Sequence, residues 1–289
     1  MTTRKIKWSR KSQPVMEGAG VRLRRAFGYH QLPQFDPFLM LDDFWSDDPA
    51  DYRKGFPWHP HRGIETITYV LKGEIEHQDS MGNQGVIGAG DVQWMTAGSG
   101  IIHQEMPQVV GDGALHGFQL WANLPASHKM MKPRYQEVKS KEIPEVGSET
   151  HCSIRIICGD YKGVSGPVKD IMTNPVFLDI SVPRDTEFNL PTPAENNMFC
   201  YVIEGAGYFC ERDEDVKIIE KNYAGNQDIL LFSEGENFIA HTRESNLRFL
   251  FLMGKPLGEP VAWGGPIVMN TQEELETAFE EYDKGTFIK

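Results

Sequence analysis

Short apolar runs separated by glycine, asparagine, aspartate and proline make up most of the chain. In the stretch ETITYVLKG at 65–73, Ile67, Tyr69 and Leu71 alternate with the residues between them, as the two faces of a β-strand do. The stretch GDVQWMTAG at 90–98 has strand composition and glycine ends. The pattern predicts an all-β protein.

Helical periodicity is clear only in TQEELETAFEEYDKG at 271–285. Thr271 and Glu274 have the spacing of a capping box. One face of the predicted helix carries the apolar residues Leu275, Ala278, Phe279 and Tyr282. We expect this helix to pack on a barrel and to carry no chemistry.

The chain also contains an internal repeat. The stretch TYVLKGEIEH at 68–77 is echoed by CYVIEGAGYF at 200–209, 132 residues later. Two copies of one β-rich unit fit a chain of 289 residues. We predict two tandem jelly-roll-like β-barrels, residues 1–140 and residues 141–289, with the short helix at the end of the second.

Two pairs of potential metal ligands lie in the first unit. His59 and His61 are one residue apart in FPWHPHRGIE, and His103 and Glu105 have the same spacing in GIIHQEMP. Residues i and i+2 of a strand point to the same side, so two strands could bring three imidazoles and one carboxylate together. Each pair alone could be structural. Together they predict a metal site with two open octahedral positions, as needed to bind substrate or dioxygen.

Three further residues near these pairs have weaker patterns. If the strand is continuous, Glu65 faces the same way as His59 and His61. We expect Glu65 to support the site or the fold rather than to bind the metal. His77 and His116 have no same-face partner of ligand type, which predicts a place on a strand surface or behind the ligands.

The second copy does not repeat the ligand set. At the offset of 132 residues, Pro191 and Pro193 stand in place of the first histidine pair, and Asn197 in place of the glutamate. Near the position of the second pair the chain has His241 and Arg243. We predict that the second barrel is a scaffold without metal.

Composition narrows the possible partners. The 29 basic and 41 acidic residues give a net charge of −12, which argues against direct binding of nucleic acid. No apolar stretch follows the basic residues near the N-terminus, so we expect no secretory signal. No apolar run in the chain reaches the length of a membrane helix, so we expect no membrane partner. The four cysteines form no C-x-x-C pair and predict buried thiols in a cytoplasmic protein.

Several stretches resemble the pirin family, a bicupin branch of the cupin superfamily. Two of them carry the two cupin motifs, although Gly73 comes one residue late and Thr96 replaces the usual proline, both of which are pirin-like departures. The resemblance extends over nearly the whole chain, in DPFLMLDDF (36–44), FPWHPHRGIET (56–66), GDVQWMTAGSGIIHQEMP (90–107) and EPVAWGGPIVMNTQEEL (259–275).

The resemblance implies one non-haem iron, Fe(II), in the N-terminal barrel, with His59, His61, His103 and Glu105 as its ligands. Zn, Mn, Ni or Cu could be loaded instead, because imidazole binds all of them and general affinity does not favour iron. The resemblance also implies a flavonol (quercetin) 2,3-dioxygenase that uses O2. Glu105 could then serve as a base as well as a ligand.

Pirins also include iron-dependent, redox-sensitive proteins that act through a transcription factor or a metabolic enzyme, so the family alone leaves two functions open. A dioxygenase requires an open cavity beside the metal, for which Phe56 and Trp58 are candidate walls; both could equally pack at the barrel mouth. A regulatory protein requires a surface for its protein partner. In either case we expect a monomer.

Overall fold

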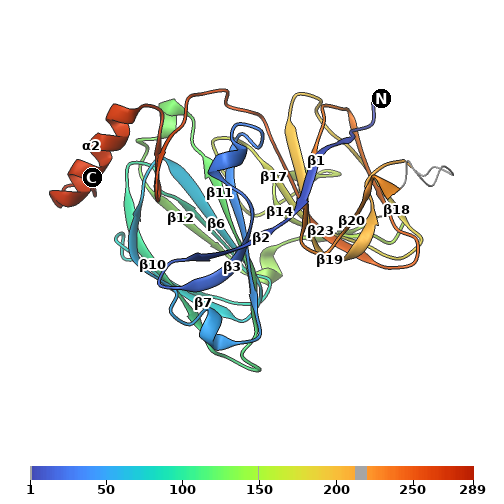
Figure 1. Cartoon of the computed structure of the whole chain (residues 1–289), viewed down its shortest axis with the longest axis horizontal. Coiled ribbons are helices and arrows are strands. Elements are labelled where there is room, and N and C mark those ends of the chain that lie inside the picture. The colour runs from blue at the N-terminus through green and yellow to red at the C-terminus, as the bar shows by residue number, and fades with distance from the viewer. Residues whose placement is uncertain (1, 149, 212–219) are drawn as a thin grey trace. The chain divides into compact units, whose positions relative to one another are not determined.

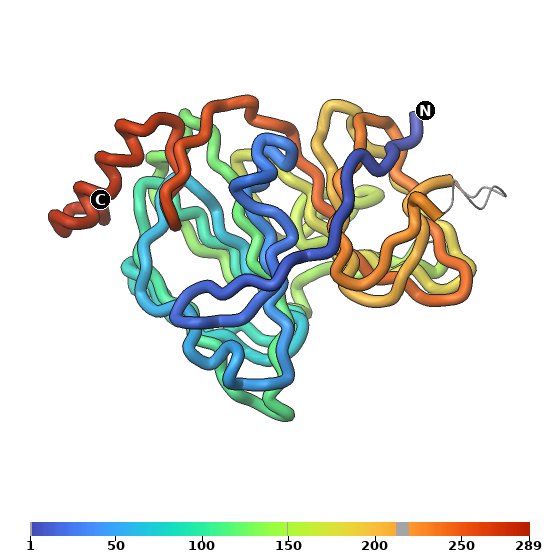
Figure 2. The backbone as a smooth tube through the Cα atoms, viewed as in Figure 1, coloured from blue at the N-terminus to red at the C-terminus, as the bar shows by residue number. Residues whose placement is uncertain are grey.

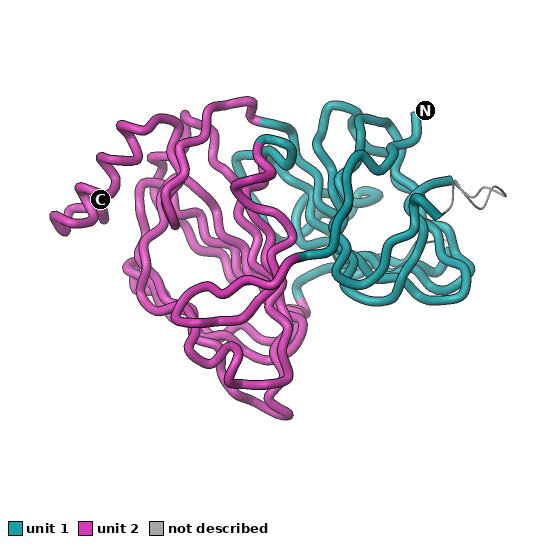
Figure 3. The backbone as a smooth tube through the Cα atoms, viewed as in Figure 1, with its two compact units in different colours: residues 1–12, 33–36, 142–256 teal, residues 13–32, 37–141, 257–289 magenta. Residues whose placement is uncertain are grey.

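The computed structural model of the chain describes residues 2–148, 150–211 and 220–289, and strands dominate it as predicted (Figure 1). No helix within these residues is long and apolar enough to cross a membrane. The chain divides into two compact units, which Figure 3 shows in separate colours. Unit 1 contains Met1–Ser12, Pro33–Asp36 and Glu142–Pro256, and unit 2 contains Gln13–Leu32, Pro37–Lys141 and Leu257–Lys289.

Unit 2 contains a seven-stranded and a four-stranded antiparallel sheet. The larger sheet has the order β12-β9-β6-β11-β4-β3-β2, and the smaller has the order β5-β10-β7-β8. The strands of the larger sheet are β2 (Gln13–Glu17), β3 (Val21–Phe27), β4 (Phe38–Ser46), β6 (Ile64–Lys72), β9 (Val92–Thr96), β11 (Leu115–Asn123) and β12 (Arg134–Val138). Those of the smaller are β5 (Phe56–His61), β7 (Glu74–Asp79), β8 (Gln84–Ile87) and β10 (Ile101–Gln108).

The C-terminal segment of the chain completes unit 2. It forms the two-stranded sheet of β24 (Ala262–Gly264) and β25 (Ile267–Met269), followed by helix α2 (Gln272–Asp283). The 3-10 helices are η1 (Tyr29–Gln31), η2 (Pro49–Asp51), η3 (Ala126–His128) and, where the chain passes into unit 1, η4 (Ser140–Glu142). Figure 2 shows the C-terminal segment in red. Its strand β25 contacts β5.

Unit 1 is built around a ten-stranded sheet with the main order β1-β21-β19-β23-β17-β14-β13, to which β18, β20 and β22 attach. Its strands are β1 (Ile6–Lys11), β13 (Glu145–Gly147), β14 (Ser153–Cys158), β17 (Val176–Val182), β18 (Glu187–Pro191), β19 (Asn197–Tyr208), β20 (Tyr223–Gly225), β21 (Asp228–Phe232), β22 (Asn237–His241) and β23 (Leu247–Gly254). A separate hairpin pairs β15 (Asp160–Tyr161) with β16 (Val164–Ser165). The unit's core is an apolar cluster that includes six phenylalanines.

The repeat seen in the sequence corresponds to one strand path used twice. In unit 2 the chain passes from β6 to β7 at Gly73, which has a φ of 85°. In unit 1 the equivalent residue is Gly205, 132 positions later, with a φ of 72° inside β19. A Cβ atom on Gly205 would lie 2.0 Å from the carbonyl oxygen of Asn246, so the turn requires glycine for space as well as for φ. The two units therefore turn at the equivalent glycine.

The compact units differ from the predicted halves at both ends of the chain. Residues 1–12 belong to unit 1, and residues 257–289 belong to unit 2 with the first barrel. The predicted helix is confirmed: Thr271 caps α2 by accepting a hydrogen bond from the backbone N–H of Glu274, whose side chain accepts from the N–H of Thr271. Of its apolar face, Leu275 and Ala278 are buried, whereas Phe279 and Tyr282 remain partly exposed.

Arg62 attaches the C-terminal segment to the barrel of unit 2. Its side chain is 2% exposed and donates from Nε to the carbonyl oxygen of Ser99 at 2.7 Å and from Nη2 to that of Phe287 at 2.9 Å. The guanidinium also lies 4.2 Å from the centre of the Phe287 ring and forms a 2.7 Å ion pair with Glu281. One side chain therefore holds both the helix and the segment after it.

Replacing Arg62 with methionine is expected to lower the free energy of unfolding by about 2–3 kcal/mol, because two buried carbonyl groups lose their donors. Urea unfolding of the variant and the wild type measures the difference. Arg22→Met is the matched control, since Arg22 is 71% exposed and its ion pair with Asp51 adds little. Equal loss in both variants would show that Arg62 has no special part in holding the segment.

Candidate metal centre

Three histidines converge at one end of the four-stranded sheet. His59 and His61 lie on β5, and His103 on β10 is directly opposite His59 in the antiparallel register. The Nε2 atom of His59 is 3.0 Å from Nε2 of His61 and 2.9 Å from Nε2 of His103. Within the described residues, these three form the group whose ligand atoms, all within 4.8 Å of one another, could hold a metal ion. We call them the histidine triad.

The outer nitrogen of each imidazole has an acceptor that fixes the ring. Nδ1 of His59 donates to the carbonyl oxygen of Pro57, and Nδ1 of His61 donates to that of Pro266, both at 2.9 Å. Each Nδ1 therefore carries the proton, and each Nε2 presents its lone pair to the centre of the triad. The Pro266 contact also makes the C-terminal segment part of the site.

His103 is oriented by a chain of buried side chains. Its Nδ1 is 3.5 Å from Nδ1 of His77, and Nε2 of His77 is 3.2 Å from Oδ2 of Asp79. If His77 donates to Asp79, its Nδ1 has a single lone pair, which the N–H of His103 at 3.5 Å and the amide of Gln93 at 3.1 Å share. Tyr135 stacks on the His77 ring at 4.9 Å. The third Nε2 of the triad is thereby left without a proton as well.

Burial keeps the triad neutral. It lowers the pKa of His59 and lowers the pKa values of His61 and His103 well below the ordinary value, with repulsion from the neighbouring imidazoles acting in the same direction. Neutral imidazole is the form that binds metals. The lone pair of His59 faces those of His61 and His103 at 3.0 and 2.9 Å and is repelled by them, and a cation between the rings removes this cost.

The spacing of the nitrogens fits a divalent metal. Imidazole nitrogens bind such ions at about 2.1 Å, so two nitrogens at right angles lie about 3.0 Å apart and two at the tetrahedral angle about 3.4 Å apart. The observed 2.9 and 3.0 Å match adjacent corners of an octahedron. The residues present therefore fit a metal with open positions better than a closed tetrahedral zinc site.

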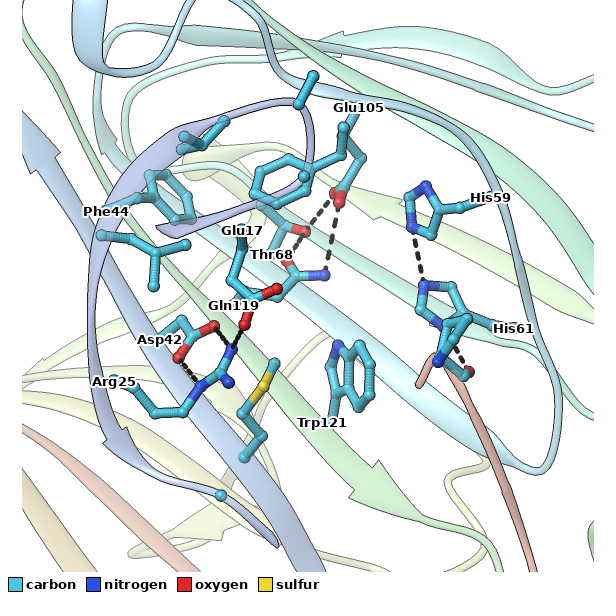
Figure 4. A pocket seen from close by; sticks show the side chains of 18 of the residues that line it. Glu17, Arg25, Asp42, Phe44, His59, His61, Thr68, Glu105, Gln119 and Trp121 are labelled. Atoms are coloured by element: carbon cyan, nitrogen blue, oxygen red, sulfur yellow. Dashed lines mark hydrogen bonds and ion pairs between the residues drawn. The ribbon is translucent and has the colours of Figure 1, made fainter. Parts of the chain in front are cut away.

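Glu105, the fourth predicted ligand, lies outside the triad. The register of β5 against β10 shifts between His103 and Glu105, so that Glu105 faces Phe56 and not Pro57. Its Oε1 is 2.8 Å from the hydroxyl of Thr68, and its Oε2 accepts a long 3.5 Å hydrogen bond from Gln119 (Figure 4). The carboxylate faces the same cavity as the triad.

Glu65 does not face the triad. The continuous strand expected through it is interrupted, because β5 ends at His61 and β6 begins at Ile64, with Gly63 at a φ of 77° between them. Glu65 instead accepts a 2.7 Å hydrogen bond from Thr96, and burial raises its pKa to about 7. These contacts lie within the fold, and the continuous strand on which Glu65 would face His59 and His61 is not formed.

His77 and His116 occupy different places. His77 is fully buried behind His103. Of the two expected positions, a strand surface or a place behind the ligands, it has the second. His116 lies at the edge of β11, 3.4 Å from Asp43. Only His77 can act on the triad.

Replacing His77 with alanine is expected to weaken metal binding by about tenfold, because His103 loses the acceptor that fixes its ring. Competition against a chromophoric chelator measures the dissociation constant. His116→Ala is the control and should leave the affinity unchanged. If both variants bind metal as the wild type does, His77 has no part in orienting the ligand.

A cavity of about 670 Å³ opens beside the triad, within the range of small-molecule sites. Its walls are mostly apolar, and aromatic side chains supply flat surfaces: Tyr29, Phe44, Phe56, Trp121 and Trp263. Trp121 stands edge-on to the His61 ring at 5.1 Å. Phe56 lines the cavity as expected, whereas Trp58 is 50% exposed and does not, because it alternates away from His59 on β5.

Sequence reasoning missed most of this cavity. Trp263 reaches it from the C-terminal segment, and Arg25, Asp42 and Gln119 reach it from the larger sheet. The alternation of β3, β4 and β11 could have shown that these residues face inward. The pairing of those strands with one another could not be derived from spacing alone.

Comparison with known proteins gives a consistent picture. A family model described as Pirin matches residues 20–122, and one described as Pirin C-terminal cupin domain matches residues 177–288. A pirin-like protein from Caulobacter vibrioides is 40% identical over 278 residues, which cover 96% of each chain. A pirin-like protein from Solanum lycopersicum is 41% identical over 270 residues, covering 93% of this chain and 88% of the relative.

Among solved structures, the crystal structure of quercetin 2,3-dioxygenase from Acinetobacter baumannii superposes with a TM-score of 0.86. The two sequences are 31% identical, and the match covers 99% of this chain and 98% of that chain. The match therefore extends over both predicted barrels.

Proposed function

Because the chain belongs to the pirin family, a group of bicupins, we propose that it is a metal-dependent dioxygenase that cleaves flavonols such as quercetin at the histidine triad. The observation that carries this proposal is the placement of three neutral imidazoles, with their lone pairs converging, at the wall of an aromatic cavity. The similarity to a quercetin 2,3-dioxygenase supports the choice of substrate class.

Fe(II) is the metal we propose, with His59, His61 and His103 as ligands and Glu105 as the fourth. When bound, a divalent metal supplies Lewis acidity that lowers the pKa of the flavonol 3-hydroxyl group and an open position for dioxygen. Glu105 would join them from the wall of the same cavity, where Thr68 and Gln119 hold its carboxylate through one hydroxyl contact and one long hydrogen bond.

The side chains around the triad then have separate tasks. Glu105 accepts the proton of the 3-hydroxyl group, which makes the flavonol ring electron-rich. Thr68 and Gln119 hold the carboxylate in position for this transfer. Trp121 and Trp263, tilted by 30° to each other at 5.8 Å, form a flat wall for the flavonol rings and exclude water from the reacting carbon atoms.

Labelling with ¹⁸O2 tests the proposal. Fe(II)-loaded protein is mixed with quercetin under ¹⁸O2, and the products are analysed by mass spectrometry. A dioxygenase places both atoms of one O2 molecule in the ring-opened product and releases carbon monoxide. Consumption of quercetin without incorporation of label would indicate simple oxidation. No consumption by protein with one iron per chain would favour a regulatory protein that acts through a partner.

A further inference from the structure

A row of polar side chains crosses the inner face of the larger sheet of unit 2. Arg25 on β3 lies opposite Asp42 on β4, and Asp42 lies opposite Gln119 on β11. Gln119 in turn lies opposite Thr68 on β6. The row therefore begins at Arg25 and ends at the Thr68 and Gln119 contacts with Glu105, beside the triad (Figure 4).

Arg25 is held rigidly at the far end of this row. Its Nε and Nη2 atoms donate to the two oxygens of Asp42 at 2.8 and 2.7 Å. Nη2 also lies 2.9 Å from Oε1 of Glu17. All three residues line the cavity, and Nη1 of Arg25 makes no hydrogen bond within the part of the chain that the structure describes. A donor in a fixed position thus faces the cavity.

The charge of this cluster selects the kind of group it can bind. One guanidinium and two carboxylates have a net charge of −1, so an anionic ligand group is repelled. Burial raises the pKa of Asp42 to about 6, yet the carboxylate is ionised at neutral pH. Asp42 uses both oxygens on Arg25, whereas Glu17, with its side chain 41% exposed, has Oε2 available to accept. A neutral hydroxyl group, which both accepts and donates, suits the pair of Arg25 and Glu17.

The distance between the two ends suits an elongated ligand. From β3 to β6 the row crosses three strand spacings of about 4.8 Å, or about 14 Å in all. A flavonol places a fused two-ring system and a third ring in line. The 3-hydroxyl group is on the central ring, so with this group at the triad one outer ring extends towards Arg25. The Arg25 side chain reaches from β3 to Asp42 on β4 and so shortens the distance that the ligand must span.

On the basis of the proposed function, we infer that Arg25 and Glu17 bind a hydroxyl group on an outer ring of the flavonol and so select polyhydroxylated flavonols over those without ring hydroxyls. Arg25 acts here as a specificity residue, away from the reacting atoms. The aromatic walls between the two ends contact any flavonol alike and provide no such selection.

Anaerobic fluorescence titration of the metal-loaded protein tests this inference with three compounds. Quercetin carries hydroxyl groups on both outer rings, galangin on one outer ring only, and 3-hydroxyflavone on neither. Hydrogen bonds to charged groups contribute enough for 3-hydroxyflavone to bind about 10- to 100-fold more weakly than quercetin. Galangin shows which outer ring is recognised. It binds as tightly as quercetin if the protein recognises the ring that carries hydroxyl groups in both compounds, and more weakly if the protein recognises the other ring.

Three variants complete the design. Arg25→Met should reduce the difference in affinity between quercetin and 3-hydroxyflavone to about twofold, because the variant loses the hydrogen bond from the charged side chain to the ligand. Arg25→Lys keeps a charge beside buried Asp42 and should give an intermediate difference, and it serves if the methionine variant does not fold. Arg22→Met, the same change on the same strand at an exposed position outside the cavity, should keep the full difference.

The outcomes separate this inference from the proposed function. Equal binding of the three compounds by the wild type, or a full difference that persists in both Arg25 variants, would overturn the inference and leave the dioxygenase proposal standing. Failure of every compound to bind, 3-hydroxyflavone included, would overturn both. A difference in affinity between quercetin and 3-hydroxyflavone that is lost in the Arg25 variants would support the inference.

Discussion

Replacing His103 with alanine is expected to weaken metal binding by at least about 100-fold and to abolish oxygen uptake with quercetin. His103 supplies one of the three imidazoles, with its Nε2 atom 2.9 Å from Nε2 of His59, and it is the member of the triad that β10 contributes. Two imidazoles on one strand cannot retain a divalent ion against a chelator. Metal content after dialysis against a chelator, measured per chain, checks the prediction.

The same substitution should leave the fold intact. His103 is fully buried, so its truncation leaves a space of one imidazole beside His77 and lowers stability modestly. Circular dichroism and the melting temperature of the apo protein serve as controls, and His116→Ala provides a histidine variant outside the triad. Wild-type metal content in the His103 variant would show that the triad is not the metal site.

Replacing Glu105 with glutamine is expected to lower kcat by about 10²- to 10⁴-fold, because the amide cannot take the proton of the flavonol 3-hydroxyl group. The amide has the same shape as the carboxylate and can keep the contact with Thr68. The Michaelis constant should change far less than kcat. Steady-state kinetics with quercetin, on samples of matched iron content, provides the measurement.

Glu76→Gln is the matched control, since Glu76 lies on β7 and bonds to Gln78 and Gln108 outside the cavity. It should leave kcat unchanged. A Glu105 variant that turns over as fast as this control would remove Glu105 from the mechanism. A variant that loses its iron, in contrast, would show that Glu105 acts chiefly as a ligand.

The secondary structure was predictable from local sequence patterns, because the long-range contacts of the fold preserve the elements that these patterns favour. Alternation within 65–73 predicted β6, and the capping-box spacing of Thr271 and Glu274 predicted the start of α2. Both signals depend on residues only a few positions apart. The repeat was also visible, because the turn at Gly73 and Gly205 constrains the sequence of both copies.

The candidate site was predictable only in part. Spacing placed His59 and His61 on one face of β5, but their meeting with His103 depends on the register of two strands more than forty residues apart. A one-residue irregularity in that register places Glu105 opposite Phe56, and the break at Gly63 separates β5 from the strand that carries Glu65. Irregularities of this kind leave no periodic signal in the sequence.

The part contributed by the C-terminal segment was not predictable. The carbonyl oxygen of Pro266 fixes the His61 ring, and Trp263 lines the cavity, although both are about two hundred residues away from β5 in the chain. The attachment of this segment through Arg62 is a long-range contact that no local pattern encodes. Apolar periodicity could place α2 on a barrel but could not choose which one.

Oxygen uptake with quercetin, measured side by side for the Fe(II)-loaded wild type and the His103→Ala variant, tests the central claim most directly. We expect uptake of one O2 per quercetin by the wild type and none above background by the variant. Equal uptake by the two proteins would place the reaction away from the triad. No uptake by iron-loaded wild type would contradict the dioxygenase proposal itself.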